Sequence, residues 1–474
     1  MRRVTTIIAL LVIVGPASGG ELTRRLDRVL SDPCTKTANQ CLIVKSLGSG
    51  KLLYSKNADR LMIPASNMKI ITSAAALGIL KPSFTFETYF RHSGARKGEI
   101  IDGDLVVEGR GDPHLVSEDL WLMVNELQKR GIRRITGDLV LDDSYFDGET
   151  FPSSWKTSST RRAFEAPMSA LALNFNSVTI NVYPASTKNE KPLAAVDPQT
   201  PYITFVNNMR SSGKGRSRIT IDLKPGTGGG ETIVLGGVVR AGSKEKTYYR
   251  AVNDPINYFG RTLIGFAKKA GITIDGRVRR GSHDKSLKEI FHHTSRPLYQ
   301  QLMDMNQYSN NFMAEQLVKT IAAETVGNPG SFEKGLLKVG EYLESLGLPA
   351  DRFHLADGSG FSRENRTSCS VIVGLLERLY TQWEGGPEFI TSLARMGREG
   401  SVEERMVSSD KAIRVKTGTL KSVSALSGYY PLPSGDILAF AMIQNNLSCG
   451  NGDVLAVQDR VLREFDAIDE GKNR

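Results

Sequence analysis

Residues 66–69 read Ser66-Asn67-Met68-Lys69, and residues 416–418 read Lys416-Thr417-Gly418. The first string follows Pro64 and opens an alanine- and leucine-rich segment that stops at Lys81-Pro82, which predicts a buried helix over about 66–80. Residues three apart share one face of a helix, so this spacing can give a serine nucleophile its own lysine base. Free N–H groups at the start of a helix also favour the negative charge that a reacting serine develops.

Strand patterns lie at both ends of the chain. Residues 42–56 form two apolar runs around a Gly-Ser-Gly turn, which predicts a β-hairpin. Three C-terminal segments separated by turn residues also have strand patterns: 412–420, 424–430 and 437–444. Helical patterns cover 255–270, 298–323 and about 453–465. We therefore expect an α/β (α+β) domain in which an antiparallel sheet, flanked by helices, joins both ends of the chain.

The middle of the chain has a different residue pattern from the two ends. Residues 86–254 contain short β-type runs, glycine-rich turns and a basic stretch. Two similar strings, Gly103-Asp104-Leu105-Val106 and Gly137-Asp138-Leu139-Val140, flank a helical pattern at about 120–128. This arrangement predicts two like strands on either side of a helix.

These patterns divide the chain into a catalytic domain with inserted material. We expect residues 21–85 and 255–474 to form the catalytic domain. An inserted α/β domain is predicted over 86–165, and an inserted basic, β-rich domain over 166–254.

The N-terminus has the order of a cleavable secretory signal. Arg2 and Arg3 precede an apolar run over 4–14, and small residues follow at 15–19. The apolar run is too short to cross about 30 Å of hydrocarbon. We expect residues 1–20 to be removed and the product to be exported to the periplasm or cell envelope, either free or loosely attached to membrane or wall.

Export makes disulfides possible, and the sequence holds four cysteines: Cys34, Cys41, Cys369 and Cys449. Cys34 and Cys41 are close in sequence, and a bridge between them adds about 2 to 3 kcal/mol of stability in the chain-entropy model. The separation of the other two gives no indication of pairing. Four buried thiols are the alternative, so the pairing stays open.

The positive charge is concentrated in one segment. The chain has a formal net charge of +10, and residues 156–250 contain 14 basic and 6 acidic side chains. An exported basic segment can face an anionic polymer such as cell wall, or a lipid surface, whereas the alternative is an ordinary solvated surface. It carries no recognised nucleic-acid-binding motif, so we expect no nucleic-acid partner. The oligomeric state is not indicated.

Three strings occur in a fixed order: Ser66-x-x-Lys69, Ser309-x-Asn311 and Lys416-Thr417-Gly418. Together they resemble the signatures shared by penicillin-binding proteins and serine β-lactamases. About 240 positions separate the first two strings, far more than in simple β-lactamases. This insertion, together with Asp357-Gly358-Ser359-Gly360, resembles the class C low-molecular-mass penicillin-binding proteins, the D-alanyl-D-alanine carboxypeptidase/endopeptidase family. The resemblance implies a penicillin-binding/serine β-lactamase-like domain with a large inserted β-rich region.

The resemblance also implies a role for each catalytic residue. Ser66 attacks the carbonyl of a D-Ala-D-Ala peptide bond and forms an acyl-enzyme. Lys69 is the base, which requires a pKa lowered by burial and by the charge of Lys416. Ser309 relays a proton to the leaving amine, and Asn311 bonds the substrate backbone or Lys69.

The third string and the residue after it are expected to bind substrate. Lys416 attracts the terminal carboxylate, and Thr417 helps to hold it. Gly418 leaves room for the substrate beside the strand. The backbone N–H groups of Thr419 and Ser66 are expected to form an oxyanion hole.

The second string has an alternative register. Tyr308-Ser309-Asn310 also reads as Tyr-x-Asn, the signature of class C β-lactamases. The following Phe312-Met313-Ala314-Glu315 and the length of the insertion resemble the peptidases instead, so Ser309 and Asn311 are favoured.

The leading interpretation is a serine D-alanyl-D-alanine carboxypeptidase, and possible endopeptidase, that acts on peptidoglycan stem peptides and is inhibited covalently by β-lactam antibiotics. One alternative is a serine β-lactamase, which also needs fast deacylation. Another is a non-catalytic wall-binding protein that uses its basic insert. A zinc enzyme is disfavoured because His292 and His293 are adjacent and no His-Glu-x-x-His occurs, so no metal or cofactor is expected.

Overall fold

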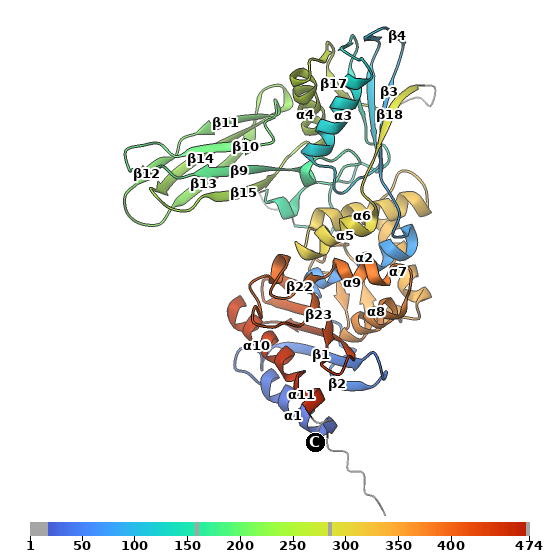
Figure 1. The fold of residues 1–474 in the computed structure, drawn as a ribbon, viewed down its shortest axis with the longest axis vertical. Coiled ribbons are helices and arrows are strands. Elements are labelled where there is room, and N and C mark those ends of the chain that lie inside the picture. Colours follow the sequence, from blue (N-terminus) through green and yellow to red (C-terminus); the bar gives the residue numbers. More distant parts are fainter. Residues whose placement is uncertain (1–17, 157–160, 283–286, 471–474) are drawn as a thin grey trace, which may run out of the picture.

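The computed structural model describes residues 18–156, 161–282 and 287–470, which form a catalytic domain and an insert at opposite ends of an elongated molecule (Figure 1). Most of the predicted signal segment, residues 1–17, lies outside the described residues. Within the described ranges, every helix is too short or too polar to span a bilayer.

A six-stranded antiparallel sheet joins the two ends of the chain, which confirms the predicted fold class. Its strands, in spatial order, are β2 (Leu52–Lys56), β1 (Asn39–Ser46), β24 (Ile437–Asn445), β23 (Val423–Pro431), β22 (Arg414–Leu420) and β21 (Ala394–Arg395). The first strand pairs with the last along its whole length, from Asn39 opposite Asn445 to Ser46 opposite Leu438. The C-terminal strands therefore complete a sheet that the N-terminal hairpin begins.

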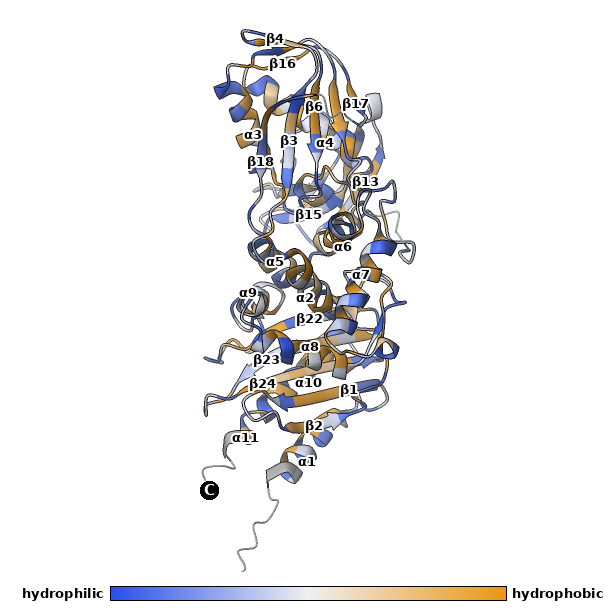
Figure 2. Ribbon diagram, turned by 90° about the vertical axis from the view of Figure 1, so that its right-hand side faces the viewer, coloured by the Kyte–Doolittle hydropathy of each residue, from blue (hydrophilic) through white to orange (hydrophobic). Residues whose placement is uncertain are grey.

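Both faces of this sheet are covered by helices. In β24, alternate residues join two different hydrophobic clusters: Leu438, Phe440 and Met442 on one face, and Ala439, Ala441 and Ile443 on the other. The first cluster includes side chains of α1 (Ser18–Leu30) and α10 (Asn451–Glu464), and the second those of α2 (Met68–Leu80) and α8 (Cys369–Thr381). The period-two pattern of a strand thus puts apolar side chains on both faces, and their burial stabilises the sandwich. In Figure 2 the central strands β1 and β24 are coloured mostly hydrophobic.

The helical pattern over 298–323 forms two helices, α5 (Leu298–Gln307) and α6 (Asn311–Thr325). The break lies at Ser309, whose backbone has a positive φ of 57°. A left-handed residue cannot continue a right-handed helix, so the chain changes direction there. Two further helices complete this side of the domain, α7 (Phe332–Ser345) and α9 (Gly386–Ser392).

The insert contains a five-stranded sheet backed by helices. In spatial order the strands are β17 (Val278–Arg280), β8 (Leu139–Asp142), β6 (Leu105–Gly109), β3 (Glu87–His92) and β18 (Lys288–Thr294). The two similar sequence strings lead into β6 and β8, which pair in parallel with Leu105 opposite Leu139, and α3 (Ser117–Lys129) lies between them in the chain. A small second sheet consists of β16 (Thr273–Ile274), β7 (Arg134–Ile135), β5 (Ile100–Asp102) and β4 (Ala95–Lys97).

The insert extends further along the chain than the sequence analysis expected. Helix α4 (Pro255–Lys269) and strands β17 and β18 were assigned to the catalytic domain, but they pack on and pair with the insert. The catalytic domain therefore resumes near residue 295, not 255. An amphipathic pattern shows that a helix has a buried face, but it does not show which partner covers that face.

The basic segment forms most of an arm, residues 177–251, that projects sideways from the insert (Figure 1). Its strands are β9 (Ser177–Tyr183), β10 (Leu193–Asp197), β11 (Ile203–Asn207), β12 (Arg210–Ser212), β13 (Arg218–Pro225), β14 (Glu231–Arg240) and β15 (Lys246–Ala251). Buried residues of β9 and β14 share one hydrophobic cluster with α3 and α4. The predicted division at residue 165 therefore does not separate two independent cores.

The insert leaves and rejoins the catalytic domain at one place. The N–H of Phe86 donates to Ser295 Oγ, and the N–H of Ser295 donates to the carbonyl of Phe86, both at 2.9 Å. The N–H of Leu298 donates to the carbonyl of Phe84 at 2.8 Å. The connection that leaves α2 for the insert and the connection that returns from the insert to α5 therefore lie side by side.

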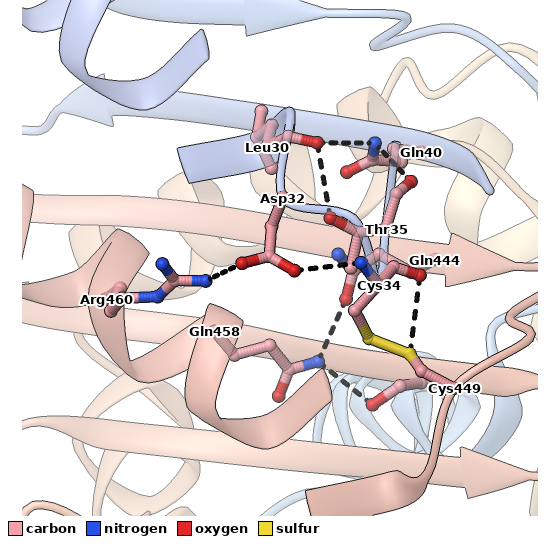
Figure 3. The surroundings of a disulfide bond; sticks show 10 residues. Leu30, Asp32, Cys34, Thr35, Gln40, Gln444, Cys449, Gln458 and Arg460 are labelled. Atoms are coloured by element: carbon pink, nitrogen blue, oxygen red, sulfur yellow. Dashed lines mark hydrogen bonds and ion pairs between the residues drawn. A yellow bond between two sulfur atoms is a disulfide. The ribbon is translucent and has the colours of Figure 1, made fainter. Parts of the chain in front are cut away.

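The four cysteines form two long-range disulfides, Cys34–Cys449 and Cys41–Cys369. Of the two arrangements that the sequence left open, neither is formed: Cys34 does not pair with Cys41, and none of the four remains a thiol. The sheet explains the pairing, because Cys41 lies on β1 facing the first residue of α8, while the chain after β24 returns to the end of α1. The Cys34–Cys449 bond lies next to Asp32, which accepts the N–H of Cys34 at 2.8 Å (Figure 3).

Candidate functional site

Ser66 lies in a 3₁₀ turn, Ala65–Asn67, that leads directly into α2. The predicted helix therefore begins two residues later than expected, at Met68. The turn is tied to the sheet by Asn67, whose fully buried side-chain amide donates to Ser427 Oγ at 2.7 Å. Ala65 has a positive φ of 48°, so the backbone turns sharply just before the serine. This turn holds the Ser66 hydroxyl at the junction of helix and sheet.

Lys69 is the second residue of α2, about one turn beyond Ser66, and is fully buried. Its Nζ donates to Ser66 Oγ at 3.2 Å, to Asn311 Oδ1 at 2.7 Å and to the carbonyl oxygen of Ser359 at 2.8 Å. Burial lowers the pKa of Lys69 to about 7, although the nearby carboxylates of Asp357 and Glu315 act to raise it. A substantial fraction of Lys69 is therefore neutral near pH 7.

Ser309 and Asn311 lie at the break between α5 and α6. Asn310 caps α6 by accepting the N–H of Met313 at 3.1 Å, whereas Asn311 contacts Lys69. The side chain of Tyr308 is 69% exposed. Ser309 and Asn311 therefore contact the two buried lysines, whereas the side chain of Asn310 caps the helix.

Lys416 lies on β22 and is fully buried. Its Nζ donates to Ser309 Oγ at 2.9 Å and to the carbonyl of Thr417 at 3.1 Å. Burial lowers the pKa of Lys416 well below its usual range, and the charge of Lys69 lowers it further. The Thr417 hydroxyl lies 2.9 Å from the hydroxyl of Ser401, and this exposed hydrogen bond lies at the edge of the site.

Strand β22 passes very close to the turn that carries the serine. A Cβ atom added at Gly418 would lie 2.8 Å from the carbonyl oxygen of Pro64 and 3.0 Å from the backbone nitrogen of Ser66. Only glycine fits this approach without a shift of the backbone. Thr419 follows on the same strand, opposite Ser424 of β23.

The insert contributes to the walls of the site. The side-chain amide of Asn311 donates to the carbonyl of Phe164 at 3.1 Å, and Trp155 Nε1 donates to Asp357 Oδ2 at 2.8 Å. The ring of Phe361 lies between Trp155 and Phe164, with centroid distances of 4.9 and 5.6 Å. The inserted domain is therefore part of the site and not a remote appendage.

The structure thus brings together all the residues of the three sequence strings, and it adds groups that sequence analysis missed. Glu315, Asp357 and the carbonyl of Ser359 surround Lys69. The string Asp357-Gly358-Ser359-Gly360 was recognised only as a family feature. A glutamate inside a helix of mostly apolar residues, as Glu315 is, was a signal of a buried charge that the sequence analysis did not use.

Comparisons with known proteins agree with this geometry. The sequence profile of the D-Ala-D-Ala carboxypeptidase 3 (S13) family matches residues 22–464. A D-alanyl-D-alanine carboxypeptidase of Actinomadura sp. (strain R39) is 33% identical over 479 residues, covering 96% of this chain and 87% of its own. D-alanyl-D-alanine carboxypeptidase DacB of Haemophilus influenzae is 26% identical over 426 residues, with coverages of 89% and 88%.

Solved structures show the same fold. The crystal structure of penicillin binding protein 4 (dacB) from Haemophilus influenzae matches with a TM-score of 0.79 at 25% identity, covering 95% of this chain and 99% of that chain. A second structure of that protein is complexed with a β-lactam. The predicted family resemblance is confirmed: the chain belongs to the D-Ala-D-Ala carboxypeptidase 3 (S13) family.

Proposed function

We propose that this D-Ala-D-Ala carboxypeptidase uses Ser66 as its nucleophile and neutral Lys69 as its general base. The observation that carries the proposal is the contact between Ser66 Oγ and the fully buried Nζ of Lys69, 3.2 Å apart. The amine takes the hydroxyl proton as Oγ attacks the carbonyl carbon of the terminal peptide bond. The C–N bond then breaks, D-alanine leaves, and water hydrolyses the acyl-enzyme.

Ser309 and Lys416 act on the leaving D-alanine: on its amine and on its carboxylate. The Ser309 hydroxyl accepts from Lys416 Nζ at 2.9 Å, and in this proposal it relays to the leaving amine the proton that Lys69 has taken from Ser66. The ammonium form of Lys416 attracts the carboxylate of the terminal D-alanine, and the Thr417 hydroxyl adds a hydrogen bond to it. This recognition of a free C-terminus favours carboxypeptidase action.

Three further groups hold the substrate. The backbone N–H groups of Ser66 and Thr419 receive the developing oxyanion, where one donor is worth about 3 to 4 kcal/mol. Gly418 keeps the strand close to Ser66, as its contacts require. The Asn311 amide orients Lys69 and borders the path of the stem peptide.

A β-lactam presents a strained amide carbonyl in place of the terminal peptide bond, so we propose that it acylates Ser66. The Haemophilus influenzae protein has been crystallised in complex with a β-lactam, which supports this proposal. The test is the intact mass of the protein and of Ser66→Ala over time after mixing with benzylpenicillin. A long-lived adduct on the unsubstituted protein alone supports the proposal. A short-lived adduct with hydrolysed drug means a β-lactamase, and no adduct overturns the catalytic role of Ser66.

The preferred peptide substrate is measured separately. Release of D-alanine from a pentapeptide ending in D-Ala-D-Ala, with no cleavage of a cross-linked dimer, supports carboxypeptidase action alone. Cleavage of the dimer at a comparable rate adds endopeptidase action, since the acylation chemistry is the same.

We also propose that the protein is exported and that its arm faces an anionic polymer of the cell wall. The exposed basic residues of the arm form no ion pair with any other described residue: Lys188, Lys191, Arg210, Lys214, Arg216, Arg218, Lys224, Arg240, Lys244 and Lys246. Unpaired exposed cations on a projecting element create a positive field that is screened by salt.

Sedimentation with purified wall fragments tests the arm. The variant Lys214→Gln/Arg216→Gln/Arg218→Gln should bind less at low salt than Lys334→Gln/Lys338→Gln, which removes surface charge from α7. Binding that is equal in the two variants, or insensitive to salt, contradicts this role.

A further inference from the structure

Glu315 is a fully buried glutamate on α6, one turn beyond Asn311. Its carboxylate accepts the N–H of Gly358 at 3.1 and 3.0 Å and the N–H of Ser359 at 2.8 Å. The carbonyl of Ser359 in turn accepts the Nζ of Lys69 at 2.8 Å. One residue of the loop therefore connects the carboxylate of Glu315 to the amine of Lys69.

This loop has no free space on either side. A Cβ atom at Gly358 would lie 2.5 Å from Val318 Cγ2 of α6. Gly360 has a positive φ of 82°, and a Cβ atom there would lie 1.8 Å from the carbonyl oxygen of Ala65, next to the nucleophile. The loop fills the gap between α6 and the turn that carries Ser66, so its position determines the distance between them.

Two other side chains hold the same loop. Thr72 Oγ1, on α2, donates to the carbonyl of Gly358 at 2.6 Å. Asp357 accepts the N–H of Gly360 and the side-chain amide of Asn365, both at 2.7 Å. Short strands β19 (Phe353–His354) and β20 (Arg366–Thr367) pair at the base of the loop. Of the side chains that hold the loop, Glu315 is the one that binds the N–H of Ser359, the residue whose carbonyl accepts from Lys69.

We propose that Glu315 is a positioning residue for acylation: it holds the carbonyl of Ser359 where that carbonyl orients the amine of Lys69. This inference rests on the proposed role of Lys69 as the general base. It assigns to Glu315 a function that acts through the loop, without contact to substrate.

The chemistry of a neutral amine explains why this carbonyl matters. A neutral lysine has two N–H donors and one lone pair. The Asn311 Oδ1 and the Ser359 carbonyl are acceptors only, and the Asn311 amide is fixed because its nitrogen donates to Phe164. When both N–H groups bind these acceptors, the lone pair is left for the proton of Ser66. Without the Ser359 carbonyl, one N–H of Lys69 has no fixed acceptor, and the lone pair is no longer held toward the hydroxyl of Ser66.

The pKa of Lys69 distinguishes a positioning role of Glu315 from a role in packing alone, because packing alone leaves this pKa unchanged. Glu315 from α6 and Asp357 from the loop raise its pKa, and Lys416 faces it from β22. Burial and the charge of Asp357 raise the pKa of Glu315 itself to about 8, so its negative charge is complete only above that pH. Glu315→Gln loosens the carbonyl acceptor at every pH and removes that charge where it is present, and both changes disfavour the ammonium form of Lys69. The pKa of Lys69 should therefore fall in this variant.

The experiment measures noncovalent binding and the acylation rate of a fluorescent penicillin from pH 5 to 10. For Glu315→Gln we expect acylation about 10- to 100-fold slower, binding changed by less than about 3-fold, and a rising limb moved to lower pH. Thr72→Val, which weakens the same loop without removing charge, should give a smaller change in the same direction. Glu324→Gln is the control on the same helix, where Glu324 accepts the hydroxyl of Tyr145.

The outcomes separate this inference from the proposed function. An unsubstituted protein that forms no penicillin adduct contradicts the proposed function itself. A folded Glu315→Gln that acylates at the normal rate, or slowly with an unmoved rising limb, overturns the positioning role. If Glu315→Gln does not fold, Thr72→Val decides: a slower reaction with a shifted limb supports the inference, and an unchanged profile overturns it.

Discussion

The Nζ of Lys416 lies 2.9 Å from Ser309 Oγ, although 107 positions separate the two residues in sequence. Lys416 belongs to the central sheet and Ser309 to the break between two helices. Their contact closes the site opposite the Ser66–Lys69 pair. The site therefore contains two serine–lysine pairs, each with a fully buried lysine.

Lys416→Met, which keeps the length of the side chain and removes its charge, should lower the acylation efficiency by about 30- to 100-fold. A charged hydrogen bond to a buried partner contributes about 2 to 3 kcal/mol. The measurement is the second-order rate constant with benzylpenicillin. Lys421→Met, at the exposed turn after β22, is the control and should leave it unchanged. Equal rates in the two variants contradict the role of Lys416.

Acylation should rise with pH through about 7, as Lys69 loses its proton, and fall again once Lys416 loses its own, because burial also lowers the pKa of Lys416 well below its usual range. Burial lowers the pKa of Lys69 to about 7, and only the neutral amine accepts the Ser66 proton, so activity is lost as pH falls. Lys69→Arg should abolish acylation across the range, because a guanidinium stays protonated. Substantial acylation by this variant is the result that excludes Lys69 as base.

Gly418→Ala should slow acylation by more than about 10-fold, because the new methyl group pushes β22 away from Pro64 and Ser66. Stability should fall by about 1 to 3 kcal/mol. Gly452→Ala, in α10 with nothing within 4 Å of the added atom, is the matched control and should retain full rate and stability. Thermal melts and penicillin kinetics on both variants give the comparison.

Removal of the Cys34–Cys449 bond by serine substitution at both positions should lower the free energy of unfolding by about 2 to 5 kcal/mol. The bond joins the segment after the N-terminal helix to the chain after β24, a separation of 415 residues. Helix α1 packs on the opposite face of the sheet from α2, which carries Lys69. Penicillin acylation at 25 °C should therefore be retained. An unchanged melting temperature shows that the tie adds nothing to stability.

Local patterns predicted what depends on local sequence. The hairpin around residues 42–56 and the three C-terminal strands follow from alternating apolar residues and turn residues. The Ser66-x-x-Lys69 spacing is likewise a property of one helical turn.

Features that depend on distant partners were not predictable in the same way. The pattern of α4 shows an amphipathic helix but does not identify the sheet that covers it. Cys34 lies near Cys41 in sequence, yet the sheet places each beside a cysteine more than 300 positions away. Glu315 contacts a loop that begins 42 residues later, which only the tertiary fold reveals.

The meeting of Phe86 and Ser295 has a consequence for how such a molecule is built. To the catalytic domain, the folded insert is equivalent to a tight turn, because its two ends are hydrogen-bonded neighbours. The long intervening segment then adds little to the entropy lost when α2 and α5 come together. Evolution can exchange, enlarge or shorten such a module without redesigning the scaffold that holds the nucleophile.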